Sequence, residues 1–137
     1  IMFENKLVAV LNKSLDSGIA MNALAHMTIG LGAQLDNESL SLDTYIDAQE
    51  NHYPNISQMP FMILRASGGK IRTTAFTARE KSILHGVFLN TMTGGTYVEQ
   101  IERTKSSKEE DLNYYGIVLY GKWDTVSEMT KKFSLWK

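Results

Sequence analysis

The pattern of apolar and polar positions divides the chain into buried strands and amphipathic helices. Residues 7–11 read Leu-Val-Ala-Val-Leu, a continuous apolar run typical of a strand that is buried on both faces of a sheet. Similar runs predict strands over residues 61–64, 87–89 and 114–120. Residues 133–136 alternate between apolar and polar side chains, which predicts a final edge strand.

A first helix is predicted directly after the first strand. Its N-cap is Asp16 or Ser17, and Gly30 and Gly32 mark its end. Apolar residues recur between these limits at the spacing that brings them onto one helix face. This stripe consists of Ala20, Ala23, Leu24, Met27 and Leu31. The helix is therefore expected to pack against the sheet.

Two further helices are predicted. The second begins at residues 67–69, which read Ser-Gly-Gly, or as late as Thr77, where a capping-box pattern starts, and Gly86 marks its end. The third spans residues 123–132, with Asp124 as its N-cap.

Two polar regions interrupt this alternation. Residues 40–46 form a short strand or a turn, residues 47–55 with His52 and Pro54 form a surface loop, and residues 96–113 form a polar connection with some helix. The order of strands and helices predicts an α/β fold, a three-layer sandwich with a mixed four- to five-stranded sheet and helices on both faces. We expect residues 1–137 to form a single domain.

Composition excludes several classes of protein. The chain has 137 residues, of which 43% are hydrophobic and 21% charged, so it is neither disordered nor collagen-like. It has no cysteine, which excludes disulfides, thiolate metal ligands and a cysteine nucleophile. The net charge is −1 with scattered basic residues, so nothing requires nucleic-acid binding. No apolar stretch is long enough for a membrane helix and no signal peptide is recognised, which suggests a cytoplasmic protein.

Motifs of the common nucleotide, metal and hydrolase sites are absent. The sequence has no G-x-x-x-x-G-K-[ST], no G-x-G-x-x-G after the first strand, no H-E-x-x-H and no G-x-S-x-G. No metal and no organic cofactor is therefore implied. Gly68-Gly69, at a predicted helix start, could hold an anion on free backbone N–H groups or simply form a turn. Residues 109–111, Glu-Glu-Asp, form a solvated loop or a docking surface.

His26 and Lys13 are the candidate catalytic residues. His26 lies in the first predicted helix, where its imidazole titrates near neutrality; it acts as a base, binds a ligand, or is structural. Lys13 follows the carboxyl end of the first strand, where α/β folds usually bind ligands, although an exposed lysine is the simpler interpretation. His52 and His85 are interpreted as structural or solvent-facing.

The two ends of the chain carry a resemblance. Residues 6–11, the Leu15-x-x-Gly18 segment and residues 20–26 resemble the opening of type II peptidyl-tRNA hydrolases. Residues 116–135 are similar to the closing strand, helix and strand of that family. The whole chain resembles a small uncharacterised group that is placed beside that fold, domain of unknown function 2000. The C-terminal sequence Met-Thr-Lys-Lys-Phe-Ser-Leu-Trp is the segment most typical of that group.

The resemblance implies the hydrolase fold more firmly than the hydrolase activity. In the hydrolases a functional lysine follows the glycine that matches Gly18, and here that position is Ile19. Their glutamine, acidic residue and threonine align with or near Ala23, Thr93 and Asn113, so that only Gly18 and His26 persist.

Three hypotheses follow for function. The first is a binding or regulatory module that holds a small ligand in the former active site. The second is a hydrolase with altered chemistry at the same cleft, with His26 as base and Lys13 as charge stabiliser; the third is retained peptidyl-tRNA hydrolysis. The expected ligand-binding residues are Asn12, Lys13, Asn22, His26, Thr91 and Thr93. The resemblance also implies a homodimer, for which Trp123, Phe133 and Trp136 could supply an apolar patch; alternatively, all three belong to the core.

Overall fold

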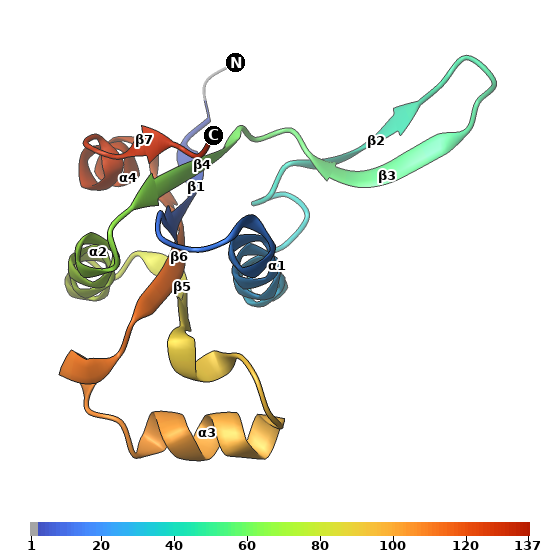
Figure 1. The fold of residues 1–137 in the computed structure, drawn as a ribbon. Coiled ribbons are helices and arrows are strands. Elements are labelled where there is room, and N and C mark those ends of the chain that lie inside the picture. The colour runs from blue at the N-terminus through green and yellow to red at the C-terminus, as the bar shows by residue number, and fades with distance from the viewer. Residues whose placement is uncertain (1–2) are drawn as a thin grey trace.

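The computed structural model describes residues 3–137 (Figure 1). Its strands are β1 (Asn5–Asn12), β2 (Leu42–Ile46), β3 (His52–Ser57), β4 (Phe61–Ala66), β5 (Leu84–Leu89), β6 (Tyr114–Lys122) and β7 (Ser134–Leu135). Its helices are α1 (Ser17–Ala33), α2 (Gly68–Glu80), α3 (Tyr97–Lys105) and α4 (Trp123–Thr130), with 3-10 turns η1 (Asn90–Met92) and η2 (Glu109–Asp111).

Five strands form one mixed sheet in the order β5-β6-β1-β4-β7. β1 lies at its centre, parallel to β4 and antiparallel to β6, and β5 is antiparallel to β6. The carboxyl ends of β1, β4 and β5 therefore meet at one edge of the sheet. The predicted α/β fold with a mixed five-stranded sheet is confirmed, and 133–136 contains the expected edge strand, β7.

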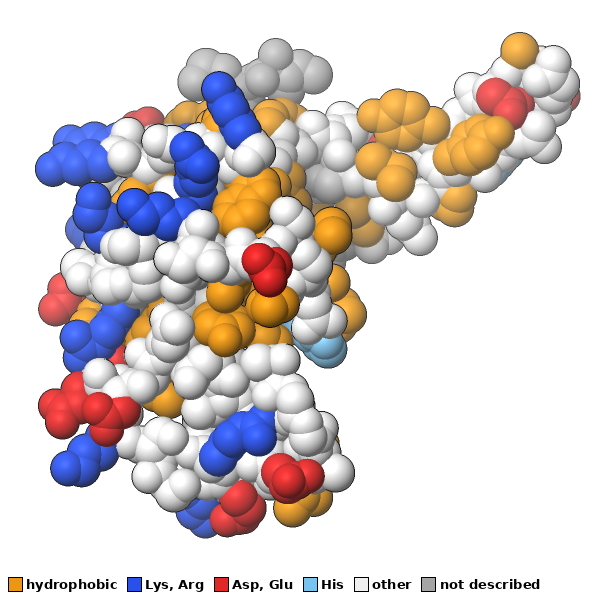
Figure 2. All heavy atoms as spheres, in the orientation of Figure 1, with side chains coloured by type: hydrophobic (Ala, Val, Ile, Leu, Met, Phe, Trp, Pro, Cys, Tyr) orange, Lys and Arg blue, Asp and Glu red, His pale blue; other side chains and the backbone are white. Residues whose placement is uncertain are grey.

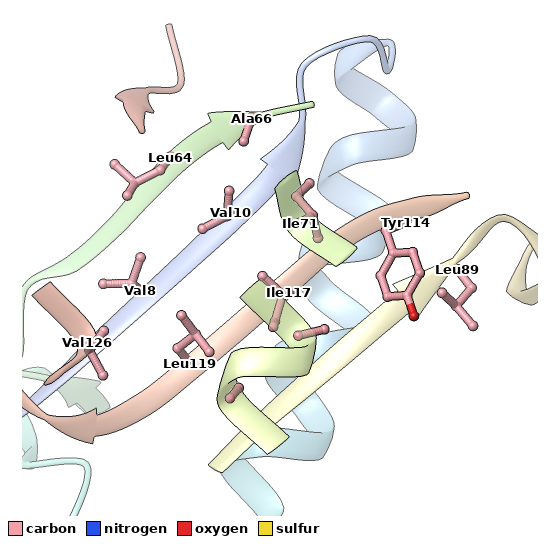
Figure 3. Packing of buried hydrophobic residues seen from close by; sticks show 12 residues of the cluster. Val8, Val10, Leu64, Ala66, Ile71, Leu89, Tyr114, Ile117, Leu119 and Val126 are labelled. Atoms are coloured by element: carbon pink, nitrogen blue, oxygen red, sulfur yellow. The ribbon is translucent and has the colours of Figure 1, made fainter. Parts of the chain in front are cut away.

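Helices cover both faces of this sheet, as expected. Alternate residues of β1 face opposite layers, because side chains of a strand point alternately to its two faces. Leu7, Ala9 and Leu11 pack in the cluster that contains the buried stripe of α1. Val8 and Val10 pack with residues of α2 and α4 on the other face (Figure 3). Burying each large aliphatic side chain stabilises the fold by about 1.5–3 kcal/mol.

A close approach joins α1 to the sheet. Gly116 of β6 lies directly beneath this helix, and a Cβ atom there would lie 2.8 Å from Met27 Cε and 3.0 Å from Leu11 Cδ2. The missing side chain of Gly116 therefore leaves the space that the end of the Met27 side chain fills.

The second sheet is a two-stranded arm, residues 42–57, which projects away from the rest of the molecule (Figure 1). The expected surface loop over 47–55 is thus wrong in part, because His52–Ser57 is strand β3. Asp47 shapes the turn: its Oδ1 accepts hydrogen bonds from the N–H groups of Gln49 and Asn51, both at 2.9 Å, and its Oδ2 accepts one from Tyr53 Oη at 2.6 Å.

Several predicted helix boundaries are corrected. α1 continues through Gly30 and Gly32 to Ala33, so these glycines do not end it. Its N-cap is Asp16, one of the two predicted residues. α4 has Lys122 as its N-cap, and Asp124 lies inside its first turn.

The second helix starts at Gly68 and not at Thr77. Ser67 is its N-cap, and Ser67 Oγ accepts a hydrogen bond from Lys70 N at 3.3 Å. Gly86, predicted as the residue after this helix, lies inside β5. The left-handed backbone conformation that follows α2 belongs to Ser82, with φ of 54°.

The polar connection between β5 and β6 contains α3, as expected in outline. Thr96 and Glu99 form a capping box, with Thr96 Oγ1 accepting from Glu99 N at 3.2 Å and Glu99 Oε1 accepting from Thr96 N at 3.0 Å. No helix in residues 3–137 is long and apolar enough to span a membrane.

Candidate functional site

Three asparagines connect the strands at the edge where β1, β4 and β5 end. Asn12 ends β1 and is 4% exposed; its Nδ2 donates to Tyr114 O at 3.0 Å and to Asn113 Oδ1 at 3.4 Å. Its Oδ1 accepts from Ser14 N at 2.9 Å. Asn90 and Asn113 exchange two hydrogen bonds, at 2.9 and 3.0 Å. Of the three asparagines, only Asn12 was predicted from the sequence, and its amide joins β1 to β6.

Lys13 lines a cavity of about 440 Å³ at the same edge. We call this the basic cavity, and its walls are Lys13, Arg65, Ala66, Ser67, Lys70, Lys132, Phe133 and Ser134. It opens beyond the carboxyl ends of the parallel strands β1 and β4, where Lys13 N donates to Ala66 O at 3.0 Å. Crevices at such strand ends are the usual ligand sites of open α/β sheets.

The charged side chains in the wall of the basic cavity are all positive. Lys13, Arg65, Lys70 and Lys132 are all exposed, and no carboxylate lies in the cavity wall. Within residues 3–137, none of these four cations takes part in an ion pair. Figure 2 shows Lys and Arg side chains gathered over the region of α2, α4 and β7. The first turn of α2 adds backbone N–H groups without helical partners.

Of these four cations, only Lys13 was predicted from the sequence. Arg65 lies on β4, Lys70 on α2 and Lys132 after α4, so they are scattered along the chain and meet only in the fold. One signal was present in the sequence. Lys70 lies in the first turn of α2, where a cation opposes the helix dipole and costs stability. A residue that breaks a local rule in this way often serves a function.

His26 lies in a different place from Lys13. It is exposed on α1 and stacks on Phe88 of β5, with ring centroids 5.8 Å apart. The cavity that it lines, about 290 Å³, is otherwise formed mainly by apolar and glycine residues, among them Met27 and Met92. Asn22 lies one turn earlier on α1 and is exposed. The roles of His26 and Asn22 in ligand binding stay predictions.

The two threonines at the end of β5 are held by α3. Thr91 is 6% exposed, and its Oγ1 accepts a hydrogen bond from Thr104 Oγ1 at 2.7 Å. Arg103 Nε donates to Thr91 O at 3.0 Å, and Arg103 Nη2 donates to Thr93 O. These contacts order the loop after β5, and a ligand-binding role for Thr91 and Thr93 stays a prediction.

The acidic run expected as a loop or docking surface supplies a structural contact. Glu109 accepts hydrogen bonds from Arg72 Nε at 2.8 Å and from Tyr114 Oη at 2.8 Å. The Arg72 guanidinium lowers the pKa of the Glu109 carboxyl to about 2, with the Tyr114 hydroxyl adding to the effect. Burial, with the hydrogen bond to Glu109, raises the pKa of Tyr114 to about 12. The contact fastens the β5–β6 connection to α2.

The aromatic residues expected at a dimer interface are half-buried. Phe133 packs against the cluster beneath α2 and α4, and Trp136 packs against the cluster beneath α1. Lys6 Nζ lies over the Trp123 ring, 5.0 Å from its centroid. The homodimer stays a prediction. The part of the chain that the structure describes contains no group of three His, Asp or Glu side chains able to hold a metal ion.

Comparison with known proteins relates the whole chain to proteins without an assigned role. The structure of the protein of unknown function Atu0240 from Agrobacterium tumefaciens str. C58 is similar, with a TM-score of 0.84 and 20% sequence identity over 99% of this chain and 100% of that one. This likeness shows the fold alone. No curated protein matches the sequence. Residues 5–137 match the family described as protein of unknown function (DUF2000). The chain therefore belongs to the DUF2000 family.

Proposed function

We propose that this chain is a binding module for a small anionic ligand, held in the basic cavity. The observation that carries the proposal is the grouping of Lys13, Arg65, Lys70 and Lys132 around one cavity without a carboxylate in its wall. Like charges brought together repel one another, so the group is costly unless an anion offsets it. Each pair in solvent contributes only about 0.2–1 kcal/mol, so a multiply charged anion gains most from contacting several cations.

Phosphate suits this cavity better than a simple carboxylate. Arg65 offers the planar fork of donors that binds phosphate at two points, and lysines supply point charges around it. The Gly68 and Gly69 N–H groups at the start of α2 are the kind of donors that hold phosphate at helix N-termini.

The order of elements at the two ends of the chain supports the fold that the resemblance implied. We infer that the chain has a type II peptidyl-tRNA hydrolase-like fold that has lost most catalytic residues and serves for binding. The elements that support this inference are β1-α1 at the start of the chain and β6-α4-β7 at its end. A hydrolase with His26 as base and Lys13 as charge stabiliser would need both at one reacting centre. Lys13 and His26 line two separate cavities, so this alternative gains no support, and retained peptidyl-tRNA hydrolysis gains none either.

The test is titration calorimetry with inorganic phosphate at low salt. We expect saturable binding that weakens severalfold when NaCl is raised from about 20 to 500 mM. The Debye length shortens as salt is added, so the attraction between phosphate and the cations is screened more strongly. Arg65→Gln and Lys70→Gln are each expected to weaken binding about three- to tenfold, or about 0.7–1.4 kcal/mol.

Lys105→Gln is the matched control, because it removes the same charge from the exposed end of α3. It should leave phosphate affinity within a factor of two of the unsubstituted protein. No binding at 10 mM phosphate, or an equal loss in Lys105→Gln and Arg65→Gln, would overturn the proposal.

A further inference from the structure

A second cavity opens directly beside the basic cavity. It measures about 470 Å³ and lies between α2 and α4, and it shares Lys70, Lys132 and Phe133 with the basic cavity as common walls. An anion bound among the four cations therefore faces a neighbouring space of small-molecule size. Resting on the proposed function, we propose that the ligand is a phosphate monoester whose hydroxylated body occupies this second cavity.

A row of threonines on α2 supplies the polar wall of the second cavity. Thr73, Thr74 and Thr77 lie three, four and seven residues after Lys70, so all four side chains share one face of the helix. At 1.5 Å of rise per residue, this face extends about 10 Å from Lys70 to Thr77. That length accommodates a sugar or a nucleoside attached to the phosphate.

The hydrogen-bonding state of the threonines defines the chemistry of the body. Thr73 Oγ1 donates to Gly69 O at 3.1 Å, Thr74 Oγ1 to Lys70 O at 2.8 Å and Thr77 Oγ1 to Thr73 O at 3.1 Å. Each hydroxyl proton is thus used, whereas the oxygen keeps lone pairs that accept. A body that carries O–H donors matches these acceptors.

The remaining walls add an apolar side, one carboxylate and one further cation, Lys131. Met129 and Phe133 are half-buried and line the cavity opposite the threonines. Glu128 lies at the same cavity, and its Oε1 accepts from Lys131 Nζ at 2.7 Å. The Glu128 carboxylate can accept further hydrogen bonds from hydroxyl groups of the ligand body. The basic cavity has four cations and no carboxylate, whereas in the second cavity the Glu128 carboxylate offsets part of the lysine charge. This difference orients a monoester with its phosphate toward Lys13 and Arg65.

The experiment compares inorganic phosphate, ribose 5-phosphate and adenosine 5′-monophosphate by titration calorimetry. We expect at least one monoester to bind tenfold or more tightly than phosphate. Thr73→Val and Thr77→Val keep shape and remove the acceptor oxygens, so each should lower monoester affinity about threefold or more and leave phosphate affinity unchanged. Thr44→Val, on the exposed arm, is the matched control and should change neither affinity. Thermal midpoints of all variants show that they fold.

The outcomes separate this inference from the proposed function. Phosphate binding with no gain for either monoester overturns the inference and leaves the anion-binding module intact. A gain that Thr73→Val and Thr77→Val both leave unchanged places the body elsewhere and also overturns it. If neither phosphate nor the monoesters bind, the proposed function falls and this inference falls with it.

Discussion

Replacing Asn12 by aspartate tests whether its amide joins β1 to β6 as the structure has it. The two side chains have nearly the same shape, so packing is unchanged. Asn12 Nδ2 lies 3.0 Å from Tyr114 O and donates to it, whereas a carboxylate oxygen at the same place would meet an acceptor. The site is almost fully buried, because Asn12 is only 4% exposed.

The magnitude follows from these contacts. Asn12→Ala leaves a buried carbonyl without its donor, which costs about 1–3 kcal/mol. Ionised Asn12→Asp buries an uncompensated charge against that carbonyl and should cost about 3–5 kcal/mol at neutral pH. Protonation restores a donor, so the pKa of the introduced carboxyl is raised in the folded state above the ordinary value near 3.9. Stability of this variant is therefore fullest at low pH and falls as pH rises through the raised pKa.

Urea denaturation at pH 4.5 and pH 7.5 measures both effects. Asn12→Asp should approach the unsubstituted protein at pH 4.5 and be least stable at pH 7.5, while Asn12→Ala should lose a similar amount at both. Asn22→Asp, on the exposed face of α1, is the control and should change stability by less than about 0.5 kcal/mol. Equal stability of Asn12→Asp and the unsubstituted protein at pH 7.5 would refute the donor role.

Three further predictions concern packing, acid stability and the arm. Gly116→Ala should cost about 1–3 kcal/mol in urea denaturation, since its Cβ would lie 2.8 Å from Met27 Cε; a cost under 0.5 kcal/mol would contradict the close approach. The pKa of Glu109 is lowered from 4.5 to about 2, so its contribution to the free energy of unfolding is present above pH 4.5 and lost as pH falls toward 2. Glu109→Gln should therefore make the free energy of unfolding less dependent on pH across that window. An unchanged pH profile would argue against the Arg72 contact. Tyr53→Phe should raise the pKa of Asp47 from about 2 toward 3.8 in an NMR titration and leave the global melting temperature unchanged. An unchanged pKa of Asp47 would show that the 2.6 Å contact does not form in solution.

The strands of the main sheet could be predicted because burial on two faces leaves a clear mark in the sequence. Strand β3 leaves no such mark. Five of its six residues are exposed, so it has no buried face, no apolar alternation, and a proline in its interior at Pro54. The prediction that Gly86 ends α2 was wrong because Ser82 adopts the left-handed conformation after this helix. Gly86 instead lies in β5 and faces α1, where a Cβ atom would lie 3.7 Å from Met27 O.

The candidate site could be predicted only in part, for a topological reason. Lys13 was recognised because its position after a buried strand is a local feature. Arg65 and Lys132 join it because β4 pairs in parallel with β1 and β7 pairs with β4. Local periodicity does not show which distant segments pair as strands, so the residues of the cavity could not be predicted together from the sequence. The first-turn position of Lys70 was the one local signal that remained.

The projecting arm also divides the chain in a useful way. Its tip, near residues 48–50, is exposed and lies far from the main sheet, which makes it a natural point for cleavage (Figure 1). One resulting fragment would contain β1 and α1, and the other would contain β4 through β7. Because β1 is hydrogen-bonded between β4 and β6, the halves would remain one particle after the backbone is cut. The molecule thus has the design of a fragment-complementation pair, in which one half supplies the central strand that the other needs to close its sheet.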